Sequence, residues 1–561
     1  MTNNEEGLKA VFKSEPGKQP ELFPVNIFDM IPDNHPVRLV NQVVDQLDIS
    51  RIMSKYKGGG TSSFHPRMML KVLFYSYLSN IYSCRKMEKA LQENIHFMWL
   101  SGRSTPDFRT INYFRGRRLK DEIDSLFTSI VKMLFDLGHV SLQKQYIDGT
   151  KIESVANRYT FVWKKSVEKN KAKLDEKIKK VLAEIHAQIK SDNEDNSGPD
   201  NGVAFNSEEL KKKISEINEA AKQKGDITKD TIKQIKKIDK EFLPKLKQYE
   251  EQLETLDGRN SYSKTDPDAT FMRLKDDHLQ SGQLKPSYNA QISTENQFLT
   301  HYSIHQTTVD TTTLEGHLDG FEQRYEMQST EVIADAGYGS EENYEMLEGK
   351  NIDGYVKYNY FHKEQSRSWK NNPFIVQNLH YNAQEDYYVC PMGQKMKNIG
   401  KKTVTSTNGY ERALTIYEAQ RCQGCPMRGQ CHNRQGNRKI EVSHRLNELK
   451  ARARELLNSD KGLEHRSRRP VEVEAVFGQM KFNNRFTRFT HRRLDKVTME
   501  FALMAIGHNL RKLAAKINEK GHLIFIFTSK HLLGLISNKN QRSNSNLIPF
   551  YSLNLHNHIA A

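Results

Sequence analysis

Residues 331–340 read EVIADAGYGS, and residues 143–150 read QKQYIDGT. Each apolar run reaches an aspartate, Asp335 or Asp148, and a glycine follows at once or one residue later. Short apolar runs bounded by turn residues are typical of buried strands. In an open α/β sheet, sites form beyond the strand ends, so two such acids on adjacent strands can meet. A lone acid at a strand end is usually satisfied by a cap or by solvent, but two in similar settings favour a site.

Strands and helices alternate around these two segments. Residues 286–310 predict two strands joined at residues 294–296, and residues 351–357 predict another. Residues 314–325 and 341–348 have the apolar spacing of helices. This order predicts a mixed α/β sheet flanked by helices.

A third acid lies in a segment that Pro470 is expected to open as a helix. An apolar stripe at helical spacing predicts its core-facing side: Val473, Val476, Phe477 and Met480. On another face, within about 60° of one another, lie an acid, a glycine and two cations: Glu474, Gly478, Lys481 and Arg485. Glu472 points away from this line, so Glu474 is the preferred candidate. The alternative is an exposed acid that pairs with its helical neighbours.

Three carboxylates in a basic cleft have a specific chemical use. Oxygen ligands hold Mg²⁺, which takes the rest of its shell from water and phosphate. Two such ions about 3.5–4 Å apart can assist an in-line phosphoryl displacement. The acids Glu153, Asp266 and Asp268 are rivals or accessories, with a structural role favoured for each.

The charge of the chain indicates a polyanionic partner. Its 561 residues carry 85 Lys and Arg against 69 Asp and Glu, a formal net charge of +16. Nucleic acid is the commonest partner for such a chain, and a merely basic protein is the alternative. No apolar run is long enough for a membrane span and the start has no signal-peptide core, which predicts a soluble cytoplasmic protein without a membrane partner. The length predicts several domains.

Residues 1–140 are expected to form a helical domain. The exposed sides of its short helices carry several cations, including Arg109 and Arg115, which suits a helix-turn-helix-like DNA-binding domain. The alternative is a helical bundle with a solvated basic face. The catalytic core is assigned to residues 141–163, 258–360 and 440–516, and residues 517–561 form a polar tail.

Two insertions are expected to interrupt the core. Residues 164–257 have apolar residues at helical spacing among dense Lys and Glu, which predicts a helical or coiled-coil insertion. Residues 361–439 predict a small β-rich insertion with Cys390, Cys422, Cys425 and Cys431. These thiols could hold Zn²⁺, with His432 as a substitute ligand, or remain buried or redox-idle.

Several long blocks resemble the DDE transposases of bacterial insertion sequences. The blocks are IDGT (residues 147–150), VIADAGYGS (332–340) and VEAVFGQMKFNNRFTRF (473–489), continuing to residue 513. Residues 65–115 resemble the helical domain that such transposases carry ahead of the catalytic fold, and the cysteine insertion resembles that of the same subgroup.

The resemblance implies an RNase H-like fold whose catalytic, metal-binding acids are Asp148, Asp335 and Glu474. It also implies divalent metal, Mg²⁺ or Mn²⁺ in two sites, and cleavage of double-stranded DNA at terminal inverted repeats, followed by strand transfer to target DNA. A homodimer or higher assembly on DNA and association with the nucleoid are expected.

The sequence departs from the family pattern just before the glutamate. The Tyr and Arg that precede it by seven and four residues in many relatives are here Ser467 and Pro470, whereas Lys481 matches the family lysine. Arg468 and Arg469 are candidates for the arginine's role. The predicted DNA-contacting cations are Lys481, Arg485, Arg468, Arg469, Arg109 and Arg115. Alternatives to a transposase are a nuclease without strand transfer and an inactive DNA-binding protein.

Overall fold

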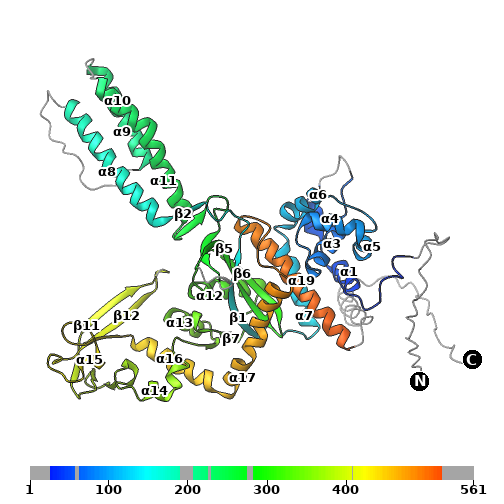
Figure 1. Ribbon diagram of the computed structural model, residues 1–561. Helices are drawn as coiled ribbons and strands as arrows, with labels where there is room; N and C mark the ends of the chain where they lie inside the picture. The colour runs from blue at the N-terminus through cyan, green and yellow to red at the C-terminus, as the bar shows by residue number, and fades with distance from the viewer. Residues whose placement is uncertain are drawn as a thin grey trace, which may run out of the picture.

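The computed structural model describes residues 26–56, 62–189, 206–224, 229–274, 282–406 and 408–520 (Figure 1). Most of the predicted polar tail, residues 517–561, lies outside this part of the chain. Within the described part, no helix combines the length and apolarity that crossing a membrane requires.

The N-terminal region is helical, as predicted. Its elements are α1 (Pro36–Gln46), α2 (Ser50–Ser54), α3 (Pro66–Leu78), α4 (Cys84–Glu93), α5 (Ile95–Ser101), α6 (Phe108–Tyr113), the π-helical turn η1 (Phe114–Leu119) and α7 (Ile123–Asp136). Helix α3 is apolar on most sides because it is enclosed by α1, α5 and the C-terminal helix α19 (Leu494–Lys520). This region therefore shares one hydrophobic core with the domain that follows it.

The central sheet is mixed, as predicted. Its strands are β1 (Lys144–Glu153), β4 (Thr270–Arg273), β5 (Leu284–Glu295), β6 (Phe298–His305), β7 (Glu331–Ala334) and β8 (Asp353–Val356). Strands β6, β5 and β1 form an antiparallel meander, and β7 and β8 then extend the sheet parallel to β1. The order β6-β5-β1-β7-β8 is consistent with an RNase H-like domain.

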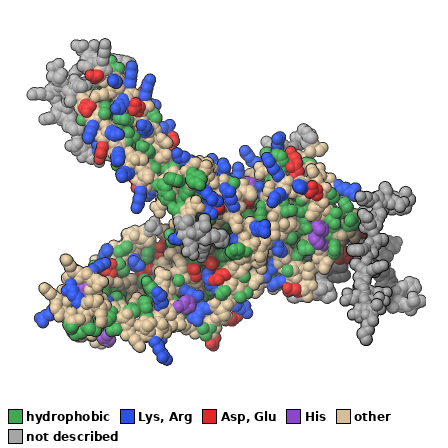
Figure 2. Space-filling view, in the orientation of Figure 1, with side chains coloured by type: hydrophobic (Ala, Val, Ile, Leu, Met, Phe, Trp, Pro, Cys, Tyr) green, Lys and Arg blue, Asp and Glu red, His purple; other side chains and the backbone are tan. Residues whose placement is uncertain are grey.

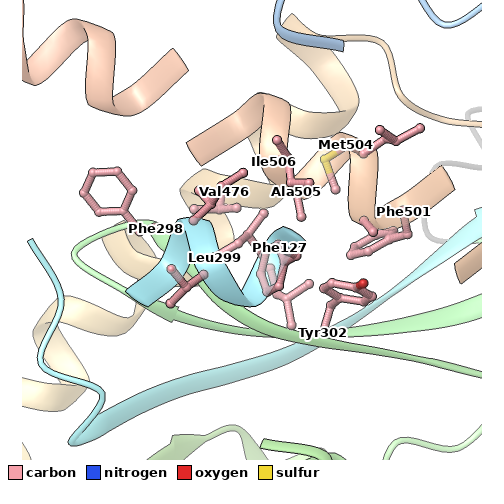
Figure 3. Packing of buried hydrophobic residues seen from close by; sticks show 14 of the residues in the cluster. Phe127, Phe298, Leu299, Tyr302, Val476, Phe501, Met504, Ala505 and Ile506 are labelled. Carbon is pink, nitrogen blue, oxygen red and sulfur yellow. The ribbon is translucent and has the colours of Figure 1, made fainter. Parts of the chain in front are cut away.

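Helices cover this sheet on both faces. They comprise η3 (Thr311–Thr313), α12 (Leu314–Tyr325), η4 (Ala336–Tyr338), α13 (Glu341–Gly349), α16 (His444–Asn458), α17 (Asp460–Arg469) and α19. Figure 3 shows α19 contributing Phe501 and Ile506 to a cluster with Phe127 of α7 and Tyr302 of β6. Burial of this stripe fixes the long C-terminal helix against both the sheet and the N-terminal helices.

The helical run that carries Glu474 differs from the prediction at its start. Pro470 does not open a helix, because α17 continues into η7 (Pro470–Glu474), α18 (Ala475–Gly478) and η8 (Gln479–Asn483). At η7 the backbone forms an i to i+5 bond, from the N–H of Ala475 to the carbonyl of Pro470. Pro470 has no N–H to donate, so the helical run passes it with one backbone hydrogen bond fewer.

Residues 164–257 are mainly helical in their described parts. Strand β2 (Phe161–Trp163) pairs with β3 (Ser261–Ser263) at its base, and the helices are α8 (Lys164–Ile189), α9 (Ser207–Lys224), α10 (Lys229–Lys237), η2 (Ile238–Phe242) and α11 (Leu243–Leu256). They pack around their own apolar cluster, which includes Ile178, Leu210 and Leu246. Helix α9 contributes Leu210, Ile214 and Ile217 to this cluster, so the insertion is a bundle of several helices.

The described part of the segment that carries the four cysteines contains short helices and five strands. It comprises η5 (Lys363–Gln365), α14 (Arg367–Lys370), η6 (Val376–Asn378), β9 (His380–Asn382), β10 (Tyr387–Val389), β11 (Lys395–Thr405), β12 (Glu411–Glu418), α15 (Arg428–Cys431) and β13 (Lys439–Val442). Its strands form an antiparallel sheet in the order β13-β12-β11-β10-β9. The two insertions project from the same side of the central sheet, away from the N-terminal helices, and leave a broad recess between them (Figures 1 and 2).

Candidate active site

The first two candidate acids lie on neighbouring parallel strands. Asp148 belongs to β1, and Asp335 directly follows β7, which pairs with β1 from Lys144 to Tyr146. The prediction that β1 ends at its aspartate is wrong. The strand continues to Glu153 because the antiparallel register with β5 holds it extended through all these residues.

Local backbone bonds orient both carboxylates. Oδ1 of Asp335 accepts a hydrogen bond from the N–H of Gly337 at 2.8 Å, which caps η4. Oδ1 of Asp148 accepts from the N–H of Gly149 at 2.8 Å. A side chain at position 149 would collide with Gln291, since its Cβ would lie 2.3 Å from the Gln291 Nε2. The glycine therefore allows β5 side chains to approach β1 next to the acid.

Arg469 joins all three acids. Its Nη2 lies 3.0 Å from Oδ2 of Asp148 and 3.9 Å from Oδ2 of Asp335, and its Nη1 donates to Oε1 of Glu474 at 2.8 Å. The Arg469 side chain is 8% exposed, compared with 15% for Asp148, 43% for Asp335 and 55% for Glu474. Three carboxylates from a strand, a strand end and a helix thus converge on one buried cation.

The three carboxylates and the guanidinium between them are the groups that matter for metal binding. The converging donors are carboxylate oxygens, which Mg²⁺ and Mn²⁺ prefer over sulfur or nitrogen. The guanidinium of Arg469 occupies the point of convergence, as a cation would. Within the described residues, no His, Cys, Asp or Glu side chains form a group of three or more close enough to hold a metal ion. As arranged here around Arg469, the three carboxylates do not form a metal site, although their oxygen donors are of the kind that a divalent ion prefers.

The neighbouring glutamate points elsewhere, as predicted. Glu472 is buried, and its Oε2 accepts from the backbone N–H of Gln297 at 2.7 Å. Burial raises the pKa of Glu472 above its ordinary value. Glu474 lies on the other side of the helical run and contacts Arg469. The geometry therefore favours Glu474 as the third acid.

Two further charged groups near the site were not identified from the sequence. Lys357 follows β8, and the pKa of its ammonium is lowered by burial and by the positive charges of Arg469 and Arg466. Asp310 precedes η3, and its Oδ1 accepts from Asn289 at 2.7 Å and Gln291 at 3.0 Å. The sequence did contain a signal for Lys357, because this residue ends the strand predicted at residues 351–357. That strand, β8, pairs in parallel with β7, which precedes Asp335.

Tyr338, three residues after Asp335, lies in a negatively charged environment at this end of the sheet. Burial raises the pKa of Tyr338 well above its ordinary value, and the charges of Asp148, Asp310 and Asp335 add to this rise. Its hydroxyl donates to Gln291. Asp310 is therefore a fourth carboxylate whose field reaches the site.

The rival acids have structural partners. Glu153 pairs with Arg158 at 2.9 Å, and Asp266 accepts from Ser154 at 2.6 Å. Asp268 accepts from the backbone N–H of Leu494 at 2.9 Å, at the start of α19. These contacts favour the structural role for each.

The cations expected to contact DNA fall into different environments. Arg109 is exposed on α6, whereas Arg115 is 2% exposed and donates to the hydroxyl of Tyr77 at 3.0 Å. Arg115 is thus almost wholly enclosed, and only a small part of its side chain reaches the surface. Arg485 lies beyond the end of η8 and has a φ of 55°. It is therefore not on the helical face that carries Glu474.

The remaining two predicted cations stay near Glu474 in sequence. Arg468 is 54% exposed and pairs with Glu464 at 3.1 Å. Lys481 is half-buried on η8, one residue from the buried Met480.

The cysteine insertion does not gather its thiols into a metal-binding group within the described residues. Sγ of Cys422 accepts from the backbone N–H of Arg438 at 3.3 Å, and Sγ of Cys431 accepts from its Nη1 at 3.2 Å. All four cysteines are unpaired thiols. This arrangement does not fit zinc without rearrangement, so zinc remains a prediction of the sequence, and metal analysis of the reduced protein decides it.

Two comparisons with protein families match parts of the chain. Residues 25–117 match a transposase domain (DUF772), and residues 389–514 match a transposase DDE domain. The second match contains Glu474 and the cysteines but begins after Asp148 and Asp335. Neither a curated protein nor a solved structure matches the chain.

Proposed function

We propose that this chain, a DDE transposase of an insertion-sequence family by its two transposase domains, cuts its element's terminal inverted repeats and joins the freed strands to target DNA. The observation that carries the proposal is the convergence of Asp148, Asp335 and Glu474 on Arg469. The two family matches support transposase function, and the three converging carboxylates are our candidates for phosphoryl transfer.

Asp148, Asp335 and Glu474 are the proposed ligands of two Mg²⁺ or Mn²⁺ ions. Bound there, the metal would activate an attacking oxygen and stabilise the leaving oxygen of a phosphodiester. Two of the carboxylates are oriented by hydrogen bonds from backbone N–H groups. Gly149 donates to Asp148, and Gly337 donates to Asp335. A site oriented before substrate arrives has less reorganisation to complete during reaction.

Arg469 and Lys357 are the proposed phosphate-positioning cations. Arg469 neutralises the acids in the absence of metal, and it can donate two parallel hydrogen bonds to a phosphate once it leaves them. Arg469 lies five residues before Glu474, near the position of the family arginine, where this chain has Pro470. Lys357 is placed close enough for its pKa to respond to Asp335 and Glu474 as well as to the arginines. Lys481 and Arg468 are proposed to follow the DNA backbone beyond the scissile phosphate.

The same site also fits a nuclease that uses water as its sole nucleophile. The order of domains favours strand transfer, because an N-terminal transposase domain accompanies the DDE domain in one chain. Cutting two DNA ends together would require a dimer or larger assembly on DNA, which we include in the proposal.

A strand-transfer assay tests the function. The substrate is a labelled duplex from the DNA flanking the gene, with inverted repeats, and a supercoiled plasmid is the target. Metal-dependent cleavage followed by joining supports the transposase. Cleavage without joining supports the nuclease, and binding without cleavage supports an inactive DNA-binding protein.

A further inference from the structure

A hollow of about 520 Å³ lies where the N-terminal helices meet the segment that precedes α19. One wall comes from α4, α6 and η1, including Arg85, Phe108 and Arg109. The other wall comes from Thr490, His491 and Lys496. None of the three proposed catalytic acids lines it, so this site is separate from the one described above.

The hollow is strongly cationic. Its lining includes Arg85, Arg109, Arg115, Arg117 and Lys496, and none of its lining residues is Asp or Glu. No described carboxylate lies within ion-pair distance of Arg85, Arg109, Arg117 or Lys496. Asp107, Asp495 and Glu500 lie near Arg109, Lys496 and Arg115 and offset part of this charge, and the remaining excess of cations favours an anionic ligand.

Buried polar atoms at the hollow lack partners. Arg115 is 2% exposed and uses Nη1 to bind Tyr77 and Tyr82, yet among the described residues its buried Nε has no hydrogen-bond partner. The buried Nε2 of His491 is also without one in this part of the chain, while its Nδ1 lies 3.0 Å from Oε2 of Glu500. Nε of Arg115 is an unsatisfied buried donor, which is costly and which a ligand oxygen would satisfy; Nε2 of a neutral His491 whose Nδ1–H faces Glu500 is an acceptor instead.

A second hollow continues the first. It has a volume of about 430 Å³ and shares Arg109 and Tyr113 with its neighbour, adding Tyr56 and Arg118. Arg118 stacks on the Tyr56 ring at 3.5 Å, and Tyr113 is 56% exposed. A track of cations with an exposed aromatic ring is longer than one phosphate ion and suits a nucleic-acid strand.

We propose that these two hollows form a binding track for the phosphodiester backbone of DNA, with a backbone phosphate seated between Arg85, Arg109 and Lys496. The segment from residue 484 to 493 connects η8, just beyond Glu474, to this track, and Arg115 holds it to the N-terminal helices through Thr490 at 3.4 Å. DNA on the track would therefore contact both transposase domains. The choice of DNA over other polyanions rests on the proposed function.

The test compares Arg85→Ala and Lys496→Ala with Lys86→Ala. Lys86 is exposed next to Arg85 on the same helix and does not line the hollow, which makes it a matched control. Affinity for a fluorescent duplex is measured in EDTA over a range of salt concentrations, so cleavage does not interfere. Each lost phosphate contact lowers the salt slope by about 0.9, which corresponds to roughly eightfold weaker binding at 0.1 M salt.

We expect this loss for Arg85→Ala and Lys496→Ala and unchanged binding for Lys86→Ala. Equal affinity and salt slope for all three folded variants would overturn the proposal. Titration with inorganic phosphate is the second arm. If phosphate binds the wild type at submillimolar concentration and Arg85→Ala abolishes that binding without affecting DNA affinity, the site is a free-phosphate site and the track is refuted. A wild type that binds DNA through this track but never cuts it would refute the proposed function alone.

Discussion

Replacing Arg469 with alanine should expose the repulsion among the three acids that it joins. The best-buried pair is Arg469 with Asp148, with side chains 8% and 15% exposed. At an effective dielectric constant near 20, unit charges about 4 Å apart interact by roughly 4 kcal/mol, and desolvation offsets part of this attraction. The pairs with Asp335 and Glu474 involve acids that are 43% and 55% exposed, so each is worth at most about 1 kcal/mol.

We therefore expect Arg469→Ala to lower the free energy of unfolding of the catalytic core by about 2–4 kcal/mol in EDTA. Urea denaturation followed by tryptophan fluorescence and circular dichroism measures this loss. Added Mg²⁺ should restore more stability to the variant than to the wild type, because the ion no longer competes with the guanidinium for the carboxylates. Cleavage should remain impaired at saturating Mg²⁺, since the phosphate-positioning cation is missing.

Arg468→Ala is the matched control for this experiment. Arg468 is adjacent in sequence but exposed, and within the described part of the chain it pairs with Glu464, four residues earlier. Its loss should change stability by no more than about 0.5 kcal/mol, with no dependence on Mg²⁺. If Arg469→Ala behaves like Arg468→Ala in EDTA, or if Mg²⁺ stabilises the wild type as much as the variant, the reasoning about Arg469 is refuted.

Three further substitutions test other parts of the structure. Gly149→Ala should lower the free energy of unfolding, measured by urea denaturation, by about 1–3 kcal/mol, because the new Cβ would meet Gln291. In the control Gly478→Ala the new Cβ meets no atom within 4 Å, so the free energy of unfolding should be unchanged or higher. Because the folded-state pKa of Glu472 is raised above 4.5, the stability that its protonated form contributes is present at acid pH and lost as pH rises through the folded value. Glu472→Gln should accordingly raise Tm at pH 7 and have little effect at pH 4, and an equal effect at both would contradict its buried placement. Arg115→Ala should cost about 2–4 kcal/mol, in contrast to a near-neutral Arg109→Ala, and equal effects would mean that Arg115 is not interior.

Local patterns predicted much of the fold. Residues 314–325 form α12 with the predicted bounds, because apolar spacing and burial agree there. Asp148 and Asp335 lie on neighbouring strands, as the similar sequence around them indicated. The preference for Glu474 over Glu472 followed from helical geometry and stays a prediction; in the structure Glu472 accepts from the backbone of Gln297, and Glu474 contacts Arg469.

Other features depend on contacts between distant residues. Arg115 looked like an exposed cation on a short helix, but Thr490, 375 residues later, encloses it. The extension of β1 beyond Asp148 depends on pairing with β5, which follows the whole helical insertion. Lys357 and Asp310 reach the site because β8 and η3 pack beside it; the strand predicted at residues 351–357 ends at Lys357, whereas no local pattern marks Asp310.

The most direct test of the central claim is single-turnover cleavage of a terminal-repeat duplex by the wild type and by Asp148→Asn, Asp335→Asn, Glu474→Gln and Glu472→Gln. With Mg²⁺, the account predicts a loss of about a thousandfold or more for each of the first three, comparable to the loss of a single catalytic residue elsewhere, while DNA affinity stays within about twofold. Glu472→Gln should cut at close to the wild-type rate. Wild-type cleavage by any of the first three variants, or loss of cleavage in Glu472→Gln alone, would contradict the assignment of these carboxylates.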